Sequence, residues 1–278
     1  MKLIENGKFS GERALFQSKD LEIRNSLFFD GESPLKESEN LKLDNCTFDW
    51  KYPLWHCRNV YAQNCTLNLT GRAGIWYADS IEMKNTEIIA PKTFRRTKNI
   101  KLENVNIPNA EETLWFCDGI EMKNVKAKGN YFGMNSENVV ISDFELDGNY
   151  PFDGGKNIEI RNSVLISKDA FWNAENVAVY DSVIRGEYLG WYSKNLTFVN
   201  CTIESLQGLC CIENLKLVNC VLENTTLAFE YSTVDADINS HVDSIFNPKG
   251  GVIRLKSVGE LTLDKDKIDP EKTKIIIK

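Results

Sequence analysis

Five of the six tryptophans in this 278-residue chain recur at a regular spacing, in a column shared with charged residues. Aromatic rings beside charged and amide groups suit sugars, whose rings present C–H faces and hydroxyls. The column reads Phe16, Lys36, Trp55, Trp76, Arg95, Trp115, Met134, Asp153, Trp172, Trp191 and Cys210. The residues that follow these include His56, Tyr77, Arg96, Phe116, Asn135, Asn173 and Tyr192. The residues three positions earlier include Tyr52, Lys92, Glu112, Tyr131, Tyr150, Asp169 and Tyr188.

From these columns we predict a saccharide-binding surface with a set of candidate catalytic groups. The candidate catalytic residues are Asp153, Arg95, Arg96, Glu112 and Asp169. The candidate binding residues are Trp55, His56, Trp76, Tyr77, Lys92, Trp115, Tyr131, Asn135, Tyr150, Trp172, Asn173, Tyr188 and Trp191. The cations suit a uronate or another anionic group, and the carboxylates could act as acids or bases. A glycosidase needs two carboxylates at a defined separation, which the sequence does not give.

The direction of the tryptophan column is open between solvent and core. Lys36, Arg95 and Asp153 share the column, which favours an outer face because burying an unpaired charge is costly. We therefore expect Arg95 to be exposed and to contribute little to folding. The alternative is an interior aromatic stack. Leu54 and Cys57 both belong to columns that we expect to face the core. In a straight strand, residues three positions apart face opposite sides, so a bend must separate the two.

An internal repeat must position these columns. The stretch Glu39–Phe48 (ENLKLDNCTF) recurs as Arg58–Leu67 (RNVYAQNCTL) and as Lys194–Ile203 (KNLTFVNCTI). The first polar residue of each copy recurs every 19 to 21 residues from position 20 to position 214, in eleven copies. A period held this closely indicates a solenoid of stacked repeats.

Within each copy, apolar and polar residues alternate, as in Leu41 and Leu43, which is typical of a strand with one buried face. A second Asn/Asp column ends each strand, and we expect it to form an amide ladder inside the solenoid. A third apolar position completes the repeat. The sequence thus predicts an all-β, single-stranded right-handed parallel β-helix of about eleven coils, with three short strands per coil. A leucine-rich repeat is disfavoured because no helical period appears.

We expect one domain over residues 1–278, capped at both ends. Residues 1–18 precede the first regular coil and are predicted to form the N-terminal cap. Regular coils should span residues 19–224. From residue 225 the period loosens, and residues 225–278 are predicted to form irregular coils and a C-terminal cap that protects the exposed edge.

Composition excludes several classes of partner. A net charge of −7 and a sequence pI of about 5.1 argue against nucleic acid. No signal peptide or membrane span is apparent, so we expect a cytoplasmic protein that does not bind membranes. The eight cysteines should then be thiols, and Cys46, Cys65, Cys201 and Cys220 fit a column of small packing residues. Their spacing predicts no metal site, and no cofactor is indicated.

The coil pattern resembles the pectin-lyase-like β-helix superfamily. The segments Gly11–Phe16 (GERALF), Lys51–Trp55 (KYPLW), Ala90–Arg96 (APKTFRR) and Gly148–Asp153 (GNYPFD) look like those of an uncharacterised bacterial family of about this length. That resemblance covers essentially the whole chain and implies the fold but no reaction. The sequence lacks the Asp-Asp, Gly-His-Gly and Arg-Ile-Lys signatures of the polygalacturonases, and it shows no calcium cluster of the pectate-lyase kind.

Two functions therefore stay open. The first is a carbohydrate-active protein that binds, hydrolyses, cleaves or isomerises a saccharide at the aromatic column. The second is a non-catalytic solenoid that serves structure or protein interaction, and a homo-oligomer is compatible with either.

Overall fold

The computed structural model describes residues 1–278 as a parallel β-solenoid of about 15 turns spaced by about 19 residues. The prediction of an all-β parallel solenoid is confirmed. The chain divides into two compact units, residues 1–145 (unit 1) and residues 146–278 (unit 2), and each is described by itself.

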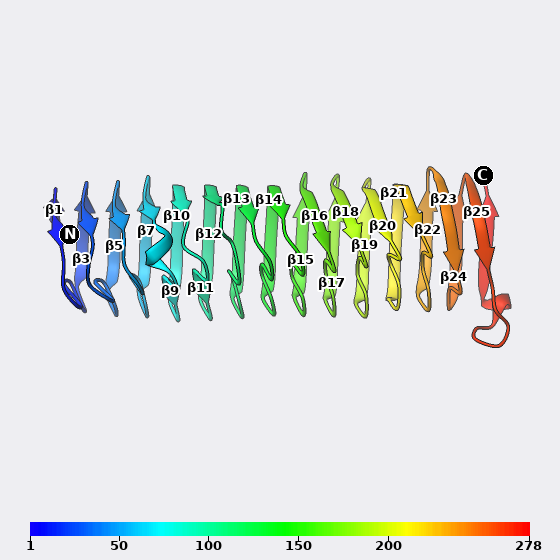
Figure 1. Ribbon diagram of the computed structural model, residues 1–278, viewed down its shortest axis with the longest axis horizontal. Coiled ribbons are helices and arrows are strands. Elements are labelled where there is room, and N and C mark those ends of the chain that lie inside the picture. The colour runs from blue at the N-terminus through cyan, green and yellow to red at the C-terminus, as the bar shows by residue number, and fades with distance from the viewer. The chain divides into compact units, whose positions relative to one another are not determined.

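In unit 1, successive coils pair in parallel through β1, β3, β5, β7, β10, β12 and β13, in chain order (Figure 1). The elements are β1 (Lys2–Glu5), β2 (Lys8–Phe9), β3 (Lys19–Arg24), β4 (Leu27–Phe28), β5 (Glu39–Asp44), β6 (Thr47–Phe48), β7 (Arg58–Gln63), β8 (Thr66–Leu67), the 3₁₀ turn η1 (Leu69–Gly71), β9 (Ile75–Trp76), β10 (Asp79–Ile88), β11 (Phe94–Arg95), β12 (Lys98–Ile107) and β13 (Asp118–Lys128). The next strand, β14 (Glu137–Asp147), runs past the end of the unit.

Unit 2 repeats the arrangement with β15, β17, β19, β21, β22, β24 and β26 paired in parallel. Its elements are β15 (Lys156–Arg161), β16 (Val164–Lys168), β17 (Glu175–Tyr180), β18 (Val183–Glu187), β19 (Lys194–Val199), β20 (Thr202–Leu206), β21 (Glu213–Thr226), β22 (Thr233–Ile238), β23 (His241–Phe246), β24 (Gly250–Leu255), β25 (Ser257–Thr262), the 3₁₀ turn η2 (Pro270–Lys272) and β26 (Thr273–Ile277).

The core of each unit follows from the alternation within its strands. In β5, Leu41 and Leu43 are each 1% exposed, whereas the intervening Lys42 is exposed. Identical positions of successive coils lie one above another, so like side chains stack. The ring centroids of Phe28 and Phe48, for example, lie 4.7 Å apart with an interplanar angle of 8°.

The turns depend on residues with left-handed backbone, which Asn adopts more readily than most side chains. Asn45, Asn104 and Asn124 have φ of 53°, 54° and 52°. Their amides form a ladder in which Asn124 Nδ2 donates to Asn104 Oδ1 over 2.8 Å. The ladder is exposed, so the prediction of a ladder inside the solenoid was wrong. The left-handed turn directs these side chains away from the core.

The coil count is higher than the eleven predicted because both ends continue the pattern. In the first eighteen residues, β1 pairs with β3 in parallel and β2 pairs with β4. After residue 225, β22, β24 and β26 extend the same sheet. Asn6 and Asn239 continue the second polar column into these coils, but the first polar column, from which the coils were counted, runs only from residue 20 to residue 214.

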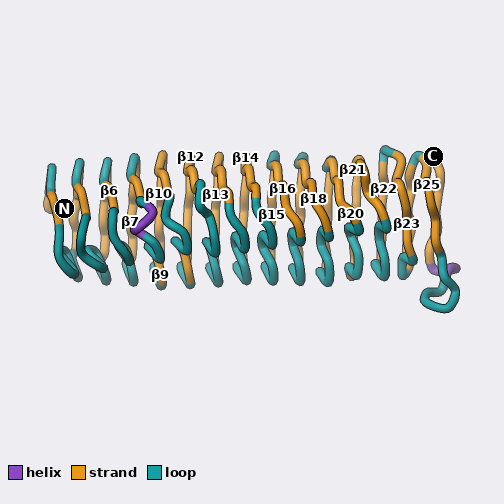
Figure 2. The backbone as a smooth tube through the Cα atoms, viewed as in Figure 1, coloured by secondary structure: helices purple, strands orange, loops and turns teal.

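The third segment of each coil is mostly turn rather than strand, as the tube in Figure 2 shows, and only β9 and β11 are strands there. It still bonds from coil to coil, since Leu54 N donates to Gly74 O and His56 N to Trp76 O, both over 2.9 Å. His56 has a φ of 55°, and this bend lets Leu54 and Cys57 both point inward at 0% exposure.

Replacing Asn104 tests the role of the left-handed turn. We expect Asn104→Ala to be less stable than Asn104→Gly by about 1–2 kcal/mol, because only the alanine must be forced into a left-handed φ. In an ordinary strand interior, glycine would be the worse of the two residues. Urea denaturation of both variants measures the order, and alanine at least as stable as glycine would contradict the assigned backbone.

Candidate functional site

The tryptophan column of unit 1 forms a half-buried stack outside the apolar core. The rings of Trp55 and Trp76 lie 5.4 Å apart with an interplanar angle of 11°. Each indole N–H is satisfied by backbone of the next coil: Trp76 Nε1 donates to Lys92 O over 2.8 Å, and Trp115 Nε1 to Tyr131 O over 2.7 Å. These tryptophans are neither fully exposed nor fully buried.

Arg95 continues this stack between two tryptophans. Its guanidinium carbon lies 4.5 Å from the Trp76 ring centroid and 4.6 Å from that of Trp115. Its Nη2 lies 3.4 Å from a Glu112 oxygen that Lys92 Nζ approaches to 3.0 Å. The side chain is 22% exposed, and its buried Nε has no hydrogen-bond partner. The expectation of an exposed Arg95 is therefore wrong, since the cation packs between aromatic faces.

The next column is more exposed and lies beside the stack. His56 and Tyr77 stack with centroids 5.0 Å apart, and Arg96 lies over Phe116 with its guanidinium carbon 5.3 Å from the centroid. Tyr77 is 46% exposed and Phe116 is 45% exposed. Arg96 is exposed and forms no ion pair. The left-handed φ of 50° at Arg96 turns its side chain outward, as at His56.

Together Tyr77, Lys92, Arg95, Arg96 and Phe116 make a surface that we call the cationic aromatic face. Of its three cations, Lys92 and Arg95 share one carboxylate, that of Glu112, and Arg96 pairs with none. The neighbouring Glu111 instead accepts hydrogen bonds from the backbone and side-chain amides of Asn130. The face thus carries local positive charge in a protein whose net charge is −7.

The remaining predicted residues of unit 1 flank this face. Trp55 lies at one end, where Tyr52 packs with its ring centroid 4.5 Å away. Tyr131 is 37% exposed and meets Trp115 edge-on at 6.4 Å. Asn135 is exposed. The structure thus brings these predicted binding residues of unit 1 onto successive coils.

Unit 2 holds a second aromatic group. Trp172 and Trp191 stack with centroids 5.8 Å apart, and Tyr188 meets Trp191 edge-on at 5.7 Å. Trp191 Nε1 donates to Gln207 O over 2.8 Å, whereas Trp172 makes no hydrogen bond through its indole N–H. Asn173 is exposed.

The candidate acids Asp153 and Asp169 lie on adjacent coils of unit 2, where Gly154 N donates to Trp172 O over 2.8 Å. Burial raises the pKa of Asp153, and the charge of Asp169 raises it further. Burial also raises the pKa of Asp169, which is 6% exposed, although a hydrogen bond with Tyr150 opposes the shift. Two carboxyls with raised pKa values are the kind of pair that acid–base catalysis uses.

The predicted site combined residues of both units, and the structure describes each unit separately. A single site centred on Arg95, Trp115 and Asp153 therefore stays a prediction. Sequence reasoning left Phe116 and Tyr192 out of the binding set, although they are 45% and 56% exposed. Their place in the column of Tyr77 was the available signal.

The structure contains no group of three or more His, Cys, Asp or Glu residues arranged to hold a metal ion. None of its helical segments has the length and apolarity to cross a membrane. The four cysteines of the small column are buried, at 0–2% exposure, as predicted.

Residues 2–276 match the family described as "Protein of unknown function (DUF3737)". The chain belongs to this family. A search of the curated proteins gave no match. Among solved structures, the chain is similar to PfbA, a surface adhesin of Streptococcus pneumoniae, with 10% identity, a TM-score of 0.41, and coverage of 94% of this chain and 81% of that one. It is also similar to the A-module of the Azotobacter vinelandii mannuronan C-5 epimerase AlgE4, with 10% identity, a TM-score of 0.29, and coverage of 99% and 88%. These likenesses concern fold alone.

The adjacent pair Arg95 and Arg96 allows a matched test of this geometry. We expect Arg95→Ala to lower the free energy of unfolding by about 1–3 kcal/mol, because two cation–π contacts are lost. Arg96→Ala should change it by less than about 0.5 kcal/mol, because that side chain is exposed. Thermal and urea unfolding measure the stability of both variants. Equal losses would contradict the placement of Arg95 between two indole rings.

The raised pKa of Asp153 predicts a pH-dependent stability. Between the ordinary pKa of 3.8 and the higher folded value, the native protein holds more protons than the unfolded chain, so stability falls as pH rises through that window. Asp153→Asn removes this effect. We expect the variant to gain stability relative to the parent as pH rises from about 3 to 7, and to show no gain at the acid end. Urea midpoints at each pH give the difference in stability between the variant and the parent. A difference that stays the same at every pH would contradict the raised pKa of Asp153.

Proposed function

We propose that this protein binds an acidic saccharide at the cationic aromatic face of unit 1. The observation that carries the proposal is Arg96, a guanidinium that is exposed, lacks an ion pair and lies over the half-exposed ring of Phe116. A folded protein seldom exposes aromatic rings beside an unpaired cation without use.

The aromatic contribution comes from the outer column rather than from the tryptophans. Arg95 covers one face of Trp76 and one face of Trp115, and Trp55 stacks on the other face of Trp76. Tyr77 and Phe116 expose more of their rings, and the apolar C–H face of a sugar suits such surfaces. The coils place these two residues on either side of the coil that carries Arg96.

The preference for an acidic sugar comes from charge. A guanidinium binds a carboxylate or sulfate in a bidentate manner, which gives strong and directional hydrogen bonds. Arg96 is free to do so, while Lys92 and Arg95 share Glu112 and add an uncompensated positive charge. A neutral sugar would leave this charge unused.

A second candidate function is acid–base chemistry on a saccharide in unit 2. Its specific observation is the raised pKa of Asp153 and of Asp169. Asp169 shares a coil with Trp172, whose indole N–H is free, and Asp153 lies on the adjacent coil. If such a reaction exists, Asp153→Asn should abolish product formation from an oligosaccharide while leaving binding intact. Activity retained in both Asp153→Asn and Asp169→Asn would exclude these carboxyls.

Calorimetric titration with a trisaccharide of uronic acid tests the binding proposal. We expect binding that weakens as salt is added and that weakens at least about tenfold in Arg96→Ala, because a charge-assisted contact is lost. The matched control is Arg58→Ala, an exposed arginine of unit 1 outside the face, which should bind as the parent does. A neutral trisaccharide of equal length should bind more weakly.

Two results would contradict the proposal. Equal affinity for the neutral and the acidic trisaccharide would remove the role of charge. Equal weakening in Arg58→Ala and Arg96→Ala would mean that binding reflects general electrostatics and not this face.

A further inference from the structure

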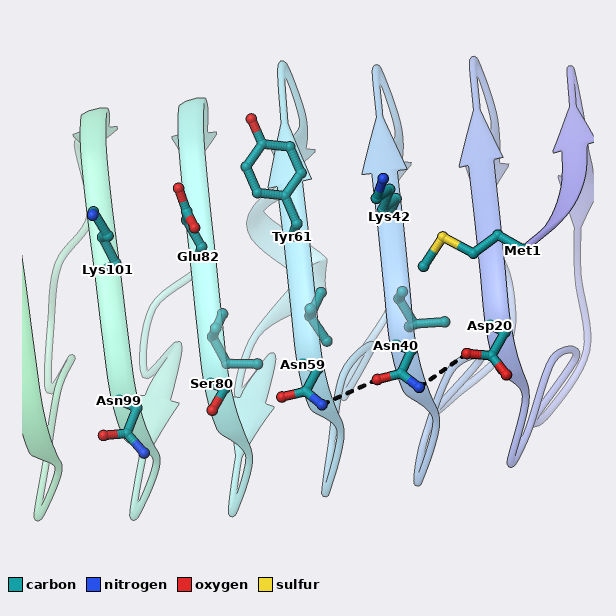
Figure 3. A pocket seen from close by; sticks show the side chains of 13 residues that line it. Met1, Asp20, Asn40, Lys42, Asn59, Tyr61, Ser80, Glu82, Asn99 and Lys101 are labelled. Carbon is teal, nitrogen blue, oxygen red and sulfur yellow. Dashed lines mark hydrogen bonds between the residues drawn. The ribbon is translucent and has the colours of Figure 1, made fainter.

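A groove of about 540 Å³ lies on the outer face of the sheet in unit 1, apart from the cationic aromatic face. Two rows of side chains line it, as Figure 3 shows. One row stands at the start of each strand and includes Asn40 of β5 and Asn59 of β7. The other stands on β5, β7, β10 and β12 and consists of Lys42, Tyr61, Glu82 and Lys101.

Lys42 and Glu82 are opposite charges without partners. The charges aligned with them are paired elsewhere. Glu22, beside Lys42, pairs with Arg24, and Lys101, beside Glu82, pairs with Glu121 over 3.8 Å. Neither Lys42 nor Glu82 forms an ion pair. The strand register places Tyr61 between them, because Lys42 and Glu82 are both aligned with it. Two strand spacings of about 4.8 Å separate the two charges, which is too far for them to neutralise each other directly.

The amide ladder beside this row stops inside the groove. Asn40 Nδ2 donates to Asp20 Oδ1 over 2.9 Å, and Asn59 Nδ2 donates to Asn40 Oδ1 over 3.0 Å. In the next coil the position is Ser80, whose hydroxyl donates to Asp79 over 3.0 Å instead. The carbonyl oxygen of Asn59 therefore has no donor, and it lines the groove at the level of Tyr61 (Figure 3).

We propose that this groove binds a zwitterion of about dipeptide to tripeptide length. Lys42 would hold the carboxylate end and Glu82 the ammonium end, whose separation matches the two strand spacings between the charges. The open oxygen of Asn59 would accept a backbone N–H from the middle of the ligand, beside the ring of Tyr61. The site is independent of the proposed saccharide site, because the two share no residue.

Nuclear magnetic resonance titration with tri-alanine is the direct test, since contacts between exposed charges give weak affinity, on the order of millimolar. We expect shifts confined to the strands that carry the groove residues. Lys42→Gln and Glu82→Gln should each raise the dissociation constant at least about threefold. The matched control is Lys156→Gln, an exposed lysine of unit 2, which should leave it unchanged.

Blocking the ends of the peptide separates this site from general electrostatics. An N-acetyl group should weaken binding to the parent protein but have no further effect on Glu82→Gln, and a C-terminal amide should behave in the same way with Lys42→Gln, because each block removes a contact that the variant already lacks. Circular dichroism verifies that both variants keep the fold.

Three results would overturn the proposal. The first is absence of shifts at the groove with tri-alanine at about ten millimolar. The second is a further loss of affinity when a blocked peptide is added to the matching variant. That result would mean that the ends of the peptide do not contact Lys42 and Glu82. The third is equal binding of alanine itself, which is too short to span both charges.

Discussion

The constraint on which the whole structure depends is the repetition of the same left-handed backbone positions in every coil. Each coil of about 19 residues must place its turns directly above those of the coil before, or the parallel hydrogen bonds between coils fail. Residues with positive φ recur at the first polar column, at the second and in the third segment. Asparagine occupies most positions of the two polar columns because its short amide tolerates the conformation and also bonds the neighbouring coil.

This repetition dictates what the outer surface can offer. Side chains of one column are held about 4.8 Å apart, which is close to the stacking distance of flat groups, so neighbours in a column stack on each other. Trp55 and Trp76 do so, and Arg95 takes the place of a ring in the same stack. A ligand therefore meets ring edges and the more exposed column beside them, where Arg96 and Phe116 lie. Binding groups arise where a column departs from its pattern.

Departures from the pattern mark the candidate sites of both units. Where the ladder residue is Ser80 rather than asparagine, the oxygen of Asn59 is left without a donor. Where the tryptophan column holds Asp153, a carboxyl sits in a partly desolvated position and its pKa rises. A regular solenoid satisfies its own polar groups, and only an exception leaves a group open to a ligand.

The sequence alone determined the fold class and the columns. The alternation of Leu41 and Leu43 and the spacing of the asparagines are local patterns, and local patterns suffice to predict strands, turns and their repeat. It did not give the number of end coils, because β1 and β26 lie where the 19-residue spacing of the first polar column is not continued. The sequence also led to the wrong side for the amide ladder. The spacing of the asparagines shows that they stack, but it does not show toward which side a left-handed turn directs them.

Only the tertiary structure decided the environment of each charged group. Arg95 and Arg96 are adjacent and identical in type, yet one is enclosed between two indoles and the other is exposed. The difference comes from residues about 20 positions away on neighbouring coils and from a bend at Arg96 whose φ is 50°. Burial, ion pairing and pKa depend on what surrounds a side chain in space, and a sequence column records only which residues share a coil position.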